Sequence, residues 1–231
     1  MRIAEIFYSI QGEGELTGVP SVFVRISGCN LRCAWCDTPY ASWEPEGRER
    51  SIEEILREVV RHSAQFVVIT GGEPMIAREL PILARRLKEA GIHITIETAG
   101  TVAPQGIACD LASISPKLSN STPAPGAIAP SWIERHDKLR LQPTILREWL
   151  EYYQCQLKFV VSSAGQIQEI EQFLERVELT IPPSQIYLMP EGRTLEELRE
   201  KSAFLVEACK SKGYRYCHRL QIELFGNTRG T

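Results

Sequence analysis

The sequence predicts an α/β fold in which mostly parallel strands form an incomplete barrel with helices on the outside. Strand-like segments alternate along the chain with helix-like segments of ten or more residues, which is typical of βαβ units. One strand-like segment, Phe66–Thr70, is continuously apolar, as expected for a strand buried on both faces. We count about six main strands, fewer than a closed eight-stranded barrel requires. The 231 residues are therefore expected to form a single core domain.

The N-terminal half is expected to supply five strands and two helices. Ser51-Ile52-Glu53-Glu54 is a capping-box pattern, and apolar residues follow at helical spacing to about His62. A second helix is expected over 78–90, because Gly91 suits its C-terminal end and Pro81 is tolerated in its first turn. Apolar alternation and β-forming residues predict strands over 3–8, 21–26, 66–70, 92–97 and around 107–114.

The C-terminal half follows the same alternation after a long loop. Residues 118–130 are rich in Ser, Pro and Ala and form the clearest loop of the chain, with no assigned role. The capping pattern Thr194-x-x-Glu197 begins a last helix, which is expected to end near Ser211. The other elements expected in this half are helices over 143–153 and 165–177 and strands over 156–161, 185–189 and near 215–224.

Composition excludes several classes of protein. Apolar residues make up 43% and charged residues 24% of the chain, which is ordinary for a globular protein. There is no apolar run long enough to span a membrane and no signal-peptide pattern at Met1, so a cytoplasmic protein is expected. The formal charge is −3 and the basic residues are scattered, so direct nucleic-acid binding is not expected.

Three of the seven cysteines are closely spaced: Cys29, Cys33 and Cys36 follow the pattern C-x3-C-x2-C. Three thiolates cannot close a four-ligand structural zinc site, and no His or fourth Cys lies nearby. A 4Fe-4S cluster held by three cysteines would leave one iron open to a ligand. A zinc site and unligated structural thiols are the alternatives. The remaining cysteines occur singly in apolar runs and are interpreted as small buried residues: Cys109, Cys155, Cys209 and Cys217.

Two glycine-containing loops follow strands. Gly12-Glu13-Gly14 suggests a tight loop whose backbone closely approaches another group, although an ordinary hairpin turn would explain it as well. Gly71-Gly72-Glu73 ends a buried strand, and free backbone NH groups beside a carboxylate would suit the amino and carboxylate groups of an amino acid. A turn without a ligand is the alternative.

Unusual polar residues collect where successive strands end. In parallel α/β folds, ligands bind at the carboxyl ends of the strands. The segments found there are the cysteine loop, Thr70–Glu73, Glu97-Thr98, Ser115–Lys117 and Met189–Glu191. Any one of them could be a simple turn, but together they predict one site at one edge of the sheet.

At this level of detail the chain resembles a known family. Its cysteine spacing is that of the radical S-adenosylmethionine (SAM) superfamily, and its motifs together resemble 7-carboxy-7-deazaguanine synthases over essentially the whole chain. These motifs are Tyr8–Gly14, Phe23–Arg25 with Gly28–Leu31, Trp35–Thr38, Thr70–Pro74, Ser115–Lys117 and Gly226–Gly230. The resemblance implies a truncated TIM-like radical SAM barrel, usually as a homodimer, and the use of an electron donor such as flavodoxin or ferredoxin. It also implies a role in the biosynthesis of queuosine-type deazapurine nucleosides.

The resemblance assigns a role to individual residues. Cys29, Cys33 and Cys36 would hold the 4Fe-4S cluster, and Thr38 matches a magnesium ligand. The substrate, 6-carboxy-5,6,7,8-tetrahydropterin, would meet Ile10, Gln11, Gly12, Arg25 and Thr70. SAM would bind the open iron and contact Trp35, Cys36, Asp37, Gly72, Glu97, Ser115, Pro116, Lys117, Leu188, Met189, Pro190 and Glu191. Cleavage of SAM to a 5'-deoxyadenosyl radical would start the reaction, and SAM would be regenerated.

Two positions near the C-terminal end carry separate expectations. Some family members are expected to have a substrate-contacting His in the last strand, where this chain has Glu223. Residues 225–231 are expected to fold over the substrate side of the incomplete barrel or over the pocket of a dimer mate, the alternative being a frayed end.

Two other functions are weighed against this one. A radical SAM activase would place a glycyl radical on a partner protein and would need an open groove for a peptide. A zinc or iron-sulfur module that senses redox state would not cleave SAM.

Overall fold

The computed structural model describes all 231 residues and contains one sheet of nine strands in the order β3-β1-β2-β4-β5-β6-β7-β8-β9. The first strands, β1 (Arg2–Ile10), β2 (Pro20–Ile26) and β3 (Arg48–Glu49), pair in antiparallel fashion. From β2 onward every neighbouring pair is parallel. These parallel strands are β4 (Phe66–Gly71), β5 (His93–Thr98), β6 (Leu111–Ile114), β7 (Cys155–Val161), β8 (Ile186–Pro190) and β9 (Arg215–Tyr216). The predicted open, mostly parallel sheet is therefore confirmed.

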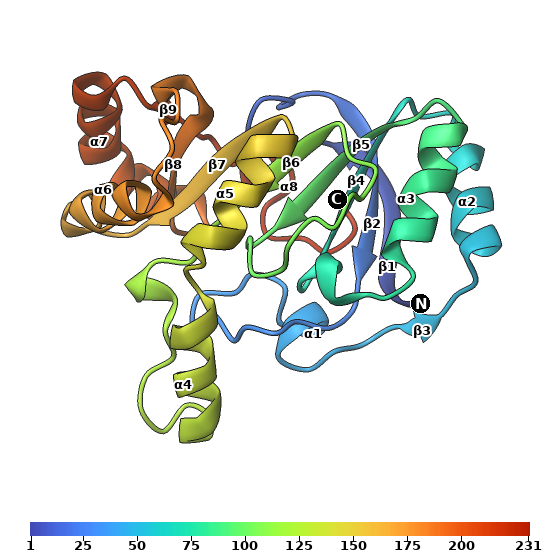
Figure 1. Cartoon of the computed structure of the whole chain (residues 1–231), viewed down its shortest axis with the longest axis horizontal. Helices are drawn as coiled ribbons and strands as arrows, with labels where there is room; N and C mark the ends of the chain where they lie inside the picture. The colour runs from blue at the N-terminus through green and yellow to red at the C-terminus, as the bar shows by residue number, and fades with distance from the viewer.

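Helices connect the parallel strands, except for β5 and β6, which a loop joins. Figure 1 shows α4 projecting away from the sheet. The cap of α2 is a complete capping box between Ser51 and Glu54, and the cap of α7 is another between Thr194 and Glu197, as the sequence predicted. The helices are α1 (Pro39–Ser42), α2 (Ile52–Arg61), α3 (Leu80–Glu89), α4 (Pro130–Leu139), α5 (Pro143–Tyr152), α6 (Gly165–Val177), α7 (Leu195–Lys212) and α8 (Leu220–Phe225). Short 3-10 turns cover Pro74–Ile76, Ser119–Ser121 and Pro183–Gln185.

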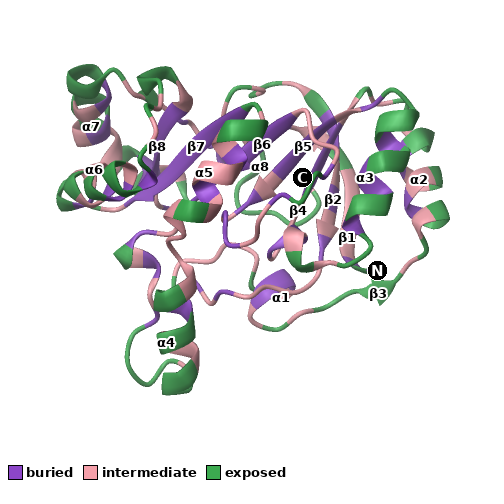
Figure 2. Ribbon diagram, in the orientation of Figure 1, coloured by how far each residue is buried: buried purple, intermediate pink, exposed green.

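The core lies between the sheet and the helices that cover it. Figure 2 shows buried residues along the central strands and exposed residues on the outer faces of α4, α6 and α7. Every residue of β7 is buried, and so is every residue of β8. A contiguous cluster of 33 buried apolar residues joins strands from both halves of the sheet to the inner faces of the helices. Burial of apolar area of this kind stabilises the sheet and leaves its carboxyl edge free for polar loops.

The last predicted strand is wrong. Only Arg215 and Tyr216 are extended, and the chain then turns into α8. Leu220, Ile222 and Leu224 alternate with polar residues, which imitates a strand. In α8 only Ile222 is buried, whereas Leu224 remains 49% exposed. Polar contacts of the first turn of the helix with the N-terminal loop, described below, determine this conformation.

Two smaller differences concern the middle of the chain. Strand β6 begins at Leu111 and not near residue 107, because Asp110 turns inward and accepts a hydrogen bond from the Ile94 backbone NH. Helix α4 lies in a part of the sequence for which no helix was expected, between the Pro-rich loop and α5. It starts at a proline, which is suited to the first turn of a helix.

Candidate active site

One cavity of about 500 Å³ opens at the carboxyl edge of the parallel strands. The structure brings nearly all of the predicted site residues together around it. Pro116, Leu188 and Pro190 are buried beside the cavity without lining it. The predicted residues that do line it are Ile10, Gln11, Gly12, Arg25, Cys29, Cys33, Trp35, Cys36, Asp37, Thr38, Thr70, Gly72, Glu97, Ser115, Lys117, Met189 and Glu191.

The cysteine loop is held by the glycine pair that ends β4. Gly28 has a φ of +112°, a backbone conformation that favours glycine. Its NH donates to the Ala41 carbonyl at 2.8 Å, and its carbonyl accepts from the Glu73 NH at 2.9 Å. A Cβ atom on Gly72 would lie 2.2 Å from the Gly28 carbonyl oxygen, so only glycine allows this approach. The pair therefore positions the backbone just before the first cysteine.

The carboxylate of Glu73 does not face the cavity, which corrects the hypothesis that it binds an amino acid. It is completely buried and accepts hydrogen bonds from Thr98 Oγ1 at 2.7 Å and from the Ala99 NH at 2.8 Å. It also caps the turn at Met75. Burial raises the pKa of Glu73, and these hydrogen bonds oppose the effect. Glu73 is thus a structural link between the loops after β4 and β5.

The three cysteines line the same cavity, and none is in a disulfide. Burial raises the pKa of the Cys29 thiol and of the Cys33 thiol to about 12. Cys29 Sγ accepts a hydrogen bond from the Leu31 NH at 3.4 Å, and Cys36 Sγ lies 3.1 Å from Ser42 Oγ. No group of three His, Cys, Asp or Glu side chains is arranged tightly enough to hold one metal ion. An iron-sulfur cluster does not need so tight an arrangement, because each of the three cysteines would bind a different iron.

This donor set fits an iron-sulfur cluster with one open iron. Three thiols reach one cavity, and no fourth protein thiol joins them there, because Cys217 bonds the Gly14 NH and packs with Val160 and Tyr187. NH-to-sulfur hydrogen bonds of the kind made by Cys29 are a recognised way of stabilising cluster thiolates. Radical SAM chemistry requires such an open position.

The loop around residues 118–122 and helix α4 together brace the cysteine loop. The Ala34 NH donates to the Ser121 carbonyl at 2.8 Å, and the Arg32 NH donates to His136 Nδ1 at 3.1 Å. His136 Nε2 lies 3.0 Å from Ser121 Oγ, which closes a short chain of hydrogen bonds. Burial lowers the pKa of His136 to about 4, so its ring is neutral and Nδ1 can accept. The Arg32 guanidinium stacks over Trp132 of α4, at 4.1 Å from the ring centroid.

The opposite wall contains aromatic residues and Arg25. Phe7 and Phe23 stack with ring centroids 4.9 Å apart, and both line the cavity. Arg25 Nε donates to Glu5 Oε1 at 2.6 Å, while its two terminal nitrogens have no hydrogen-bond partner in the protein. Thr38 also lines the cavity. Its hydroxyl makes no capping bond to α1 and lies 3.8 Å from Cys36 Sγ.

An array of charged side chains crosses the floor of the cavity, and the sequence analysis missed its two cations, Lys158 and Arg219. Lys158 Nζ lies 2.6 Å from Glu97 Oε2 and 3.0 Å from Glu13 Oε2. Arg219 lies 3.1 Å from Glu13 Oε1 and forms a second ion pair with Asp37. Lys158 is the only charged residue in its strand, and this pattern could have identified it from the sequence.

The pKa values of Glu13, Lys158 and Arg219 favour the charged forms of these three residues. Burial alone would raise the pKa of Glu13, but Lys158 and Arg219 hold it well below its usual range. Burial alone would lower the pKa of Lys158, but Glu97 and Glu13 raise it above its ordinary value. The pKa of Arg219 rises for the same reason, through Asp37 and Glu13. The cavity floor therefore carries fixed charges of both signs.

Two polar atoms at the cavity are buried without a protein partner: Trp35 Nε1 and Gln221 Oε1. Such atoms are costly unless something satisfies them, so they fit a cavity that accepts polar ligands. Lys117 Nζ lies 5.4 Å from the Trp35 ring centroid and donates to Ser115 Oγ at 2.7 Å. Trp35, Ser115 and Lys117 form the side of the cavity where SAM was predicted to bind.

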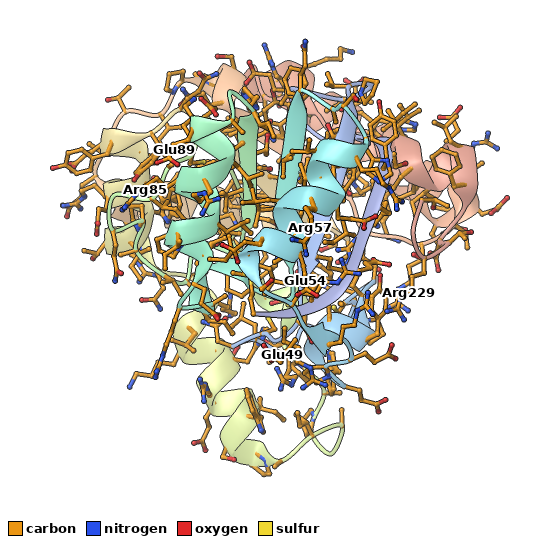
Figure 3. The ribbon with its side chains drawn as sticks, turned by 90° about the vertical axis from the view of Figure 1, so that its right-hand side faces the viewer. Glu49, Glu54, Arg57, Arg85, Glu89 and Arg229 are labelled. Carbon is orange, nitrogen blue, oxygen red and sulfur yellow. The ribbon has the colours of Figure 1, made fainter.

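Helix α8 and the segment after it close another side. The Leu220 NH donates to the Gly12 carbonyl at 3.0 Å, and Gln221 Nε2 donates to Glu13 Oε1 at 2.7 Å. Residues 226–231 line the cavity. Figure 3 shows Arg229 beside the β1 ribbon, where it pairs with Glu46 at 2.8 Å and with Glu5 at 3.3 Å.

Glu223 does not occupy a strand position comparable to that of the expected His. It lies on α8 and not in a strand, and it does not line the cavity. Its carboxylate is exposed and lies 2.6 Å from His218 Nε2. The misplacement follows from the error in the last predicted strand. Gln221, two residues earlier in the same helix, lines the cavity.

None of the helices is both long and apolar enough to cross a membrane.

Residues 23–115 match the family model of the radical SAM superfamily. Over its whole length the chain is 48% identical to a 7-carboxy-7-deazaguanine synthase of Rhodopirellula baltica and covers 89% of that protein. It is likewise 41% identical to a 7-carboxy-7-deazaguanine synthase of Halobacterium salinarum, of which it covers 93%.

Solved structures similar to this chain point to the same superfamily fold. QueE from Escherichia coli superposes with a TM-score of 0.63 and 28% identity, covering 94% of this chain and 92% of that chain. SuiB from Streptococcus suis superposes with a TM-score of 0.56 at 16% identity, over 84% of this chain and 47% of that chain, and shares the fold alone. With the cysteine loop, the open sheet and full-length relatives in agreement, the chain belongs to the 7-carboxy-7-deazaguanine synthase family of radical SAM enzymes.

Proposed function

We propose that this enzyme converts 6-carboxy-5,6,7,8-tetrahydropterin into 7-carboxy-7-deazaguanine with release of ammonia, in the biosynthesis of queuosine-type nucleosides. The observation that carries the proposal is the shared cavity: the cysteines Cys29, Cys33 and Cys36 line one wall and Arg25 lines another. The substrate contains the same atoms as the product plus ammonia, so the overall reaction needs no net oxidant or reductant. This balance agrees with SAM acting as a regenerated cofactor.

The residues present fit both cofactors. The three cysteines would hold the 4Fe-4S cluster, and SAM would lie between Gly72, Trp35 and the Ser115–Lys117 segment. When bound, cluster and SAM together supply a 5'-deoxyadenosyl radical that removes a hydrogen atom from C6 of the pterin. The protein binds, orients and shields these reactants, and its own residues account for each of those tasks.

Arg25 and the N-terminal loop are suited to bind the substrate. The two free terminal nitrogens of Arg25 can form a fork on the pterin carboxylate. Ile10, Gln11 and Gly12 line the same cavity, as does Thr70, the neighbour of Arg25 across the β2–β4 pair. The aromatic pair Phe7 and Phe23 gives the same wall an apolar surface, which keeps water away from the reacting ring.

We propose that Thr38 contributes a ligand to a magnesium ion. Magnesium takes oxygen ligands in octahedral geometry and keeps several waters, so one hydroxyl and substrate oxygens form a plausible shell. The Thr38 hydroxyl is free of a capping bond and faces the cavity, which fits this role.

Other parts of the proposal rest on composition and on the family. The 33-residue core supports the treatment of residues 1–231 as one core domain. Seven cysteines without a disulfide suit the reducing cytoplasm. An electron donor such as flavodoxin or ferredoxin and assembly as a homodimer complete the proposal. The shared name of the relatives points to a small molecule and not to a glycyl-radical partner protein.

One experiment tests the function directly. The purified protein would be reconstituted anaerobically with iron and sulfide, then incubated with SAM, a reductant, magnesium and the carboxypterin. The expected result is a product whose mass equals that of the substrate minus ammonia, with many turnovers per SAM. SAM cleavage that leaves the pterin unchanged would point to a different radical SAM reaction, and the absence of both pterin conversion and SAM cleavage would point to a binding module.

A further inference from the structure

Lys158 is the central cation of the charge array. Its side chain is only 1% exposed, in a strand of which every residue is buried. An ammonium group in such a place is costly unless carboxylates compensate for its lost hydration. Glu97 and Glu13 provide this compensation at 2.6 and 3.0 Å. The strand thus carries a charge that its packing does not require, since an apolar residue of similar volume would fill the same space.

The two carboxylates belong to different walls of the cavity. Glu97 lies near the end of β5, on the side proposed to hold SAM, whereas Glu13 lies in the loop that would meet the substrate. Gln11 joins the same two walls: its Nε2 donates to Glu97 Oε1 at 3.3 Å, and its Oε1 accepts from the Glu13 NH at 3.1 Å. Gln11, Glu13, Lys158 and Glu97 therefore form a closed ring.

Within the ring, the two carboxylates depend on Lys158 to different degrees. Glu13 also accepts hydrogen bonds from Arg219 and Gln221, so it keeps strong partners without the lysine. Glu97 has no other cation, and its remaining contact is the 3.3 Å bond from Gln11. Loss of Lys158 would free Glu97 on the SAM side and weaken the connection between the walls.

We propose that Lys158 is a positioning residue that couples the binding of SAM to the binding of the carboxypterin, so that each ligand increases the affinity for the other. The inference rests on the proposed function. Ordering of Glu97 by one ligand orders Glu13 and Gln11 through the ring, and the second ligand then binds to a wall that is already ordered. Because such coupling is reciprocal, both ligands must show the same factor.

The test measures binding without turnover. Cluster-loaded protein without reductant would be titrated with SAM in the absence and presence of saturating carboxypterin, and then with the ligands exchanged. We expect each ligand to increase the affinity for the other about tenfold in the wild type. In Lys158→Met this factor should fall below about twofold, while SAM alone still binds. In Lys158→Arg, which keeps the charge, the coupling should be partly restored.

Two further variants separate positioning from folding. The double variant Lys158→Met, Glu97→Gln removes the carboxylate that the single variant leaves without a cation. It should therefore fold even where Lys158→Met does not, and it should also lack coupling. Lys212→Met removes a lysine that pairs with Glu171 outside the cavity, and it should retain the full factor. Iron content and thermal midpoint show that each variant is folded and loaded.

The possible results distinguish failure of the inference from failure of the proposed function. Equal coupling in the wild type and in the folded Lys158 variants would overturn the inference and leave the proposed function intact. Independent binding of the two ligands in the wild type would also overturn the inference and leave the proposed function intact. If the wild type neither binds nor converts the carboxypterin, the proposed function fails first, and the inference fails with it.

Discussion

Glu5 accepts a 2.6 Å hydrogen bond from the Nε of Arg25 and so fixes the direction of its guanidinium. The same carboxylate accepts from the Tyr40 hydroxyl at 2.7 Å and from Arg229 at 3.3 Å. Nε is therefore occupied, and the edge formed by the two terminal nitrogens is left for a ligand. One half-buried carboxylate thus connects the proposed substrate-binding arginine to the segment that closes the cavity.

Replacement of Arg25 by lysine should weaken substrate binding and leave SAM binding unchanged. A lysine cannot form the bidentate pair with a carboxylate, and it cannot keep the Nε contact to Glu5. We expect KM for the carboxypterin to rise about tenfold or more. Steady-state kinetics and SAM titration measure the two effects, and an unchanged KM would refute the assignment.

Reconstituted protein should contain about four irons per chain and show a reduced-state electron spin resonance signal that changes on addition of SAM. The reason is the open iron left by three protein ligands. Cys33→Ala should lose the cluster, whereas Cys209→Ala, at a buried thiol outside the cavity, should keep it. Tightly bound zinc without uptake of iron would contradict the prediction.

Thr38→Ala should abolish most of the stimulation of turnover by magnesium, because the variant lacks the proposed oxygen ligand. The control is Thr180→Ala, at an exposed position outside the cavity, which should respond to magnesium like the wild type. Measurement of turnover against magnesium concentration gives the comparison. Identical magnesium curves for Thr38→Ala and the wild type would rule out the metal role.

Deletion of residues 225–231 should preserve iron content and SAM affinity but lower carboxypterin turnover by about a hundredfold. These residues line the cavity, and Arg229 attaches them to Glu5 and Glu46. A milder variant, Arg229→Met, removes the attachment without shortening the chain and should have a smaller effect in the same direction. Full turnover by the shortened enzyme would show that the segment is a frayed end.

His136 should make the stability of the cluster-free protein dependent on pH. Burial lowers its pKa to about 4 in the folded protein, from an ordinary value of 6.5, so the unfolded chain binds the proton first. The contribution is complete above pH 6.5 and is lost as the pH falls toward 4, by up to about 3 kcal/mol. Urea unfolding at pH 7 and pH 4.5 measures the loss.

In His136→Gln the loss of stability between these two pH values should be smaller than in the wild type. His62→Gln, at the end of α2, serves as the control and should behave like the wild type. If wild type and His136→Gln lost the same free energy, the buried ring would not be the source of the pH dependence.

The elements predicted correctly are those that local patterns determine. The bounds of α6 agree with its helical spacing, and the apolar run Phe66–Thr70 is indeed a buried strand. Capping boxes act within four residues, so α2 and α7 were predicted from their first turns. Motif resemblance alone assigned the cysteines and Arg25 to one site, and both line the same cavity.

The errors arose where distant contacts override local patterns. Helix α8 replaces a predicted strand because Arg219 and Gln221 bind Glu13, more than two hundred residues away in the chain. Helix α4 is held by His136 and Trp132, whose partners lie in the cysteine loop. Neither relationship leaves a pattern in the neighbouring sequence, so no reading of periodicity could have found them.

The ion pair between Asp37 and Arg219 joins residues 182 positions apart in the chain. At ribosomal rates of about 5–20 residues per second, the cysteine loop is synthesised about 10 to 40 s before the arginine that ties it to the far side of the barrel. During that interval one wall around the thiols is missing. Iron and sulfide carriers have their widest access to Cys29, Cys33 and Cys36 while the chain is still being made, and oxidants have the same access.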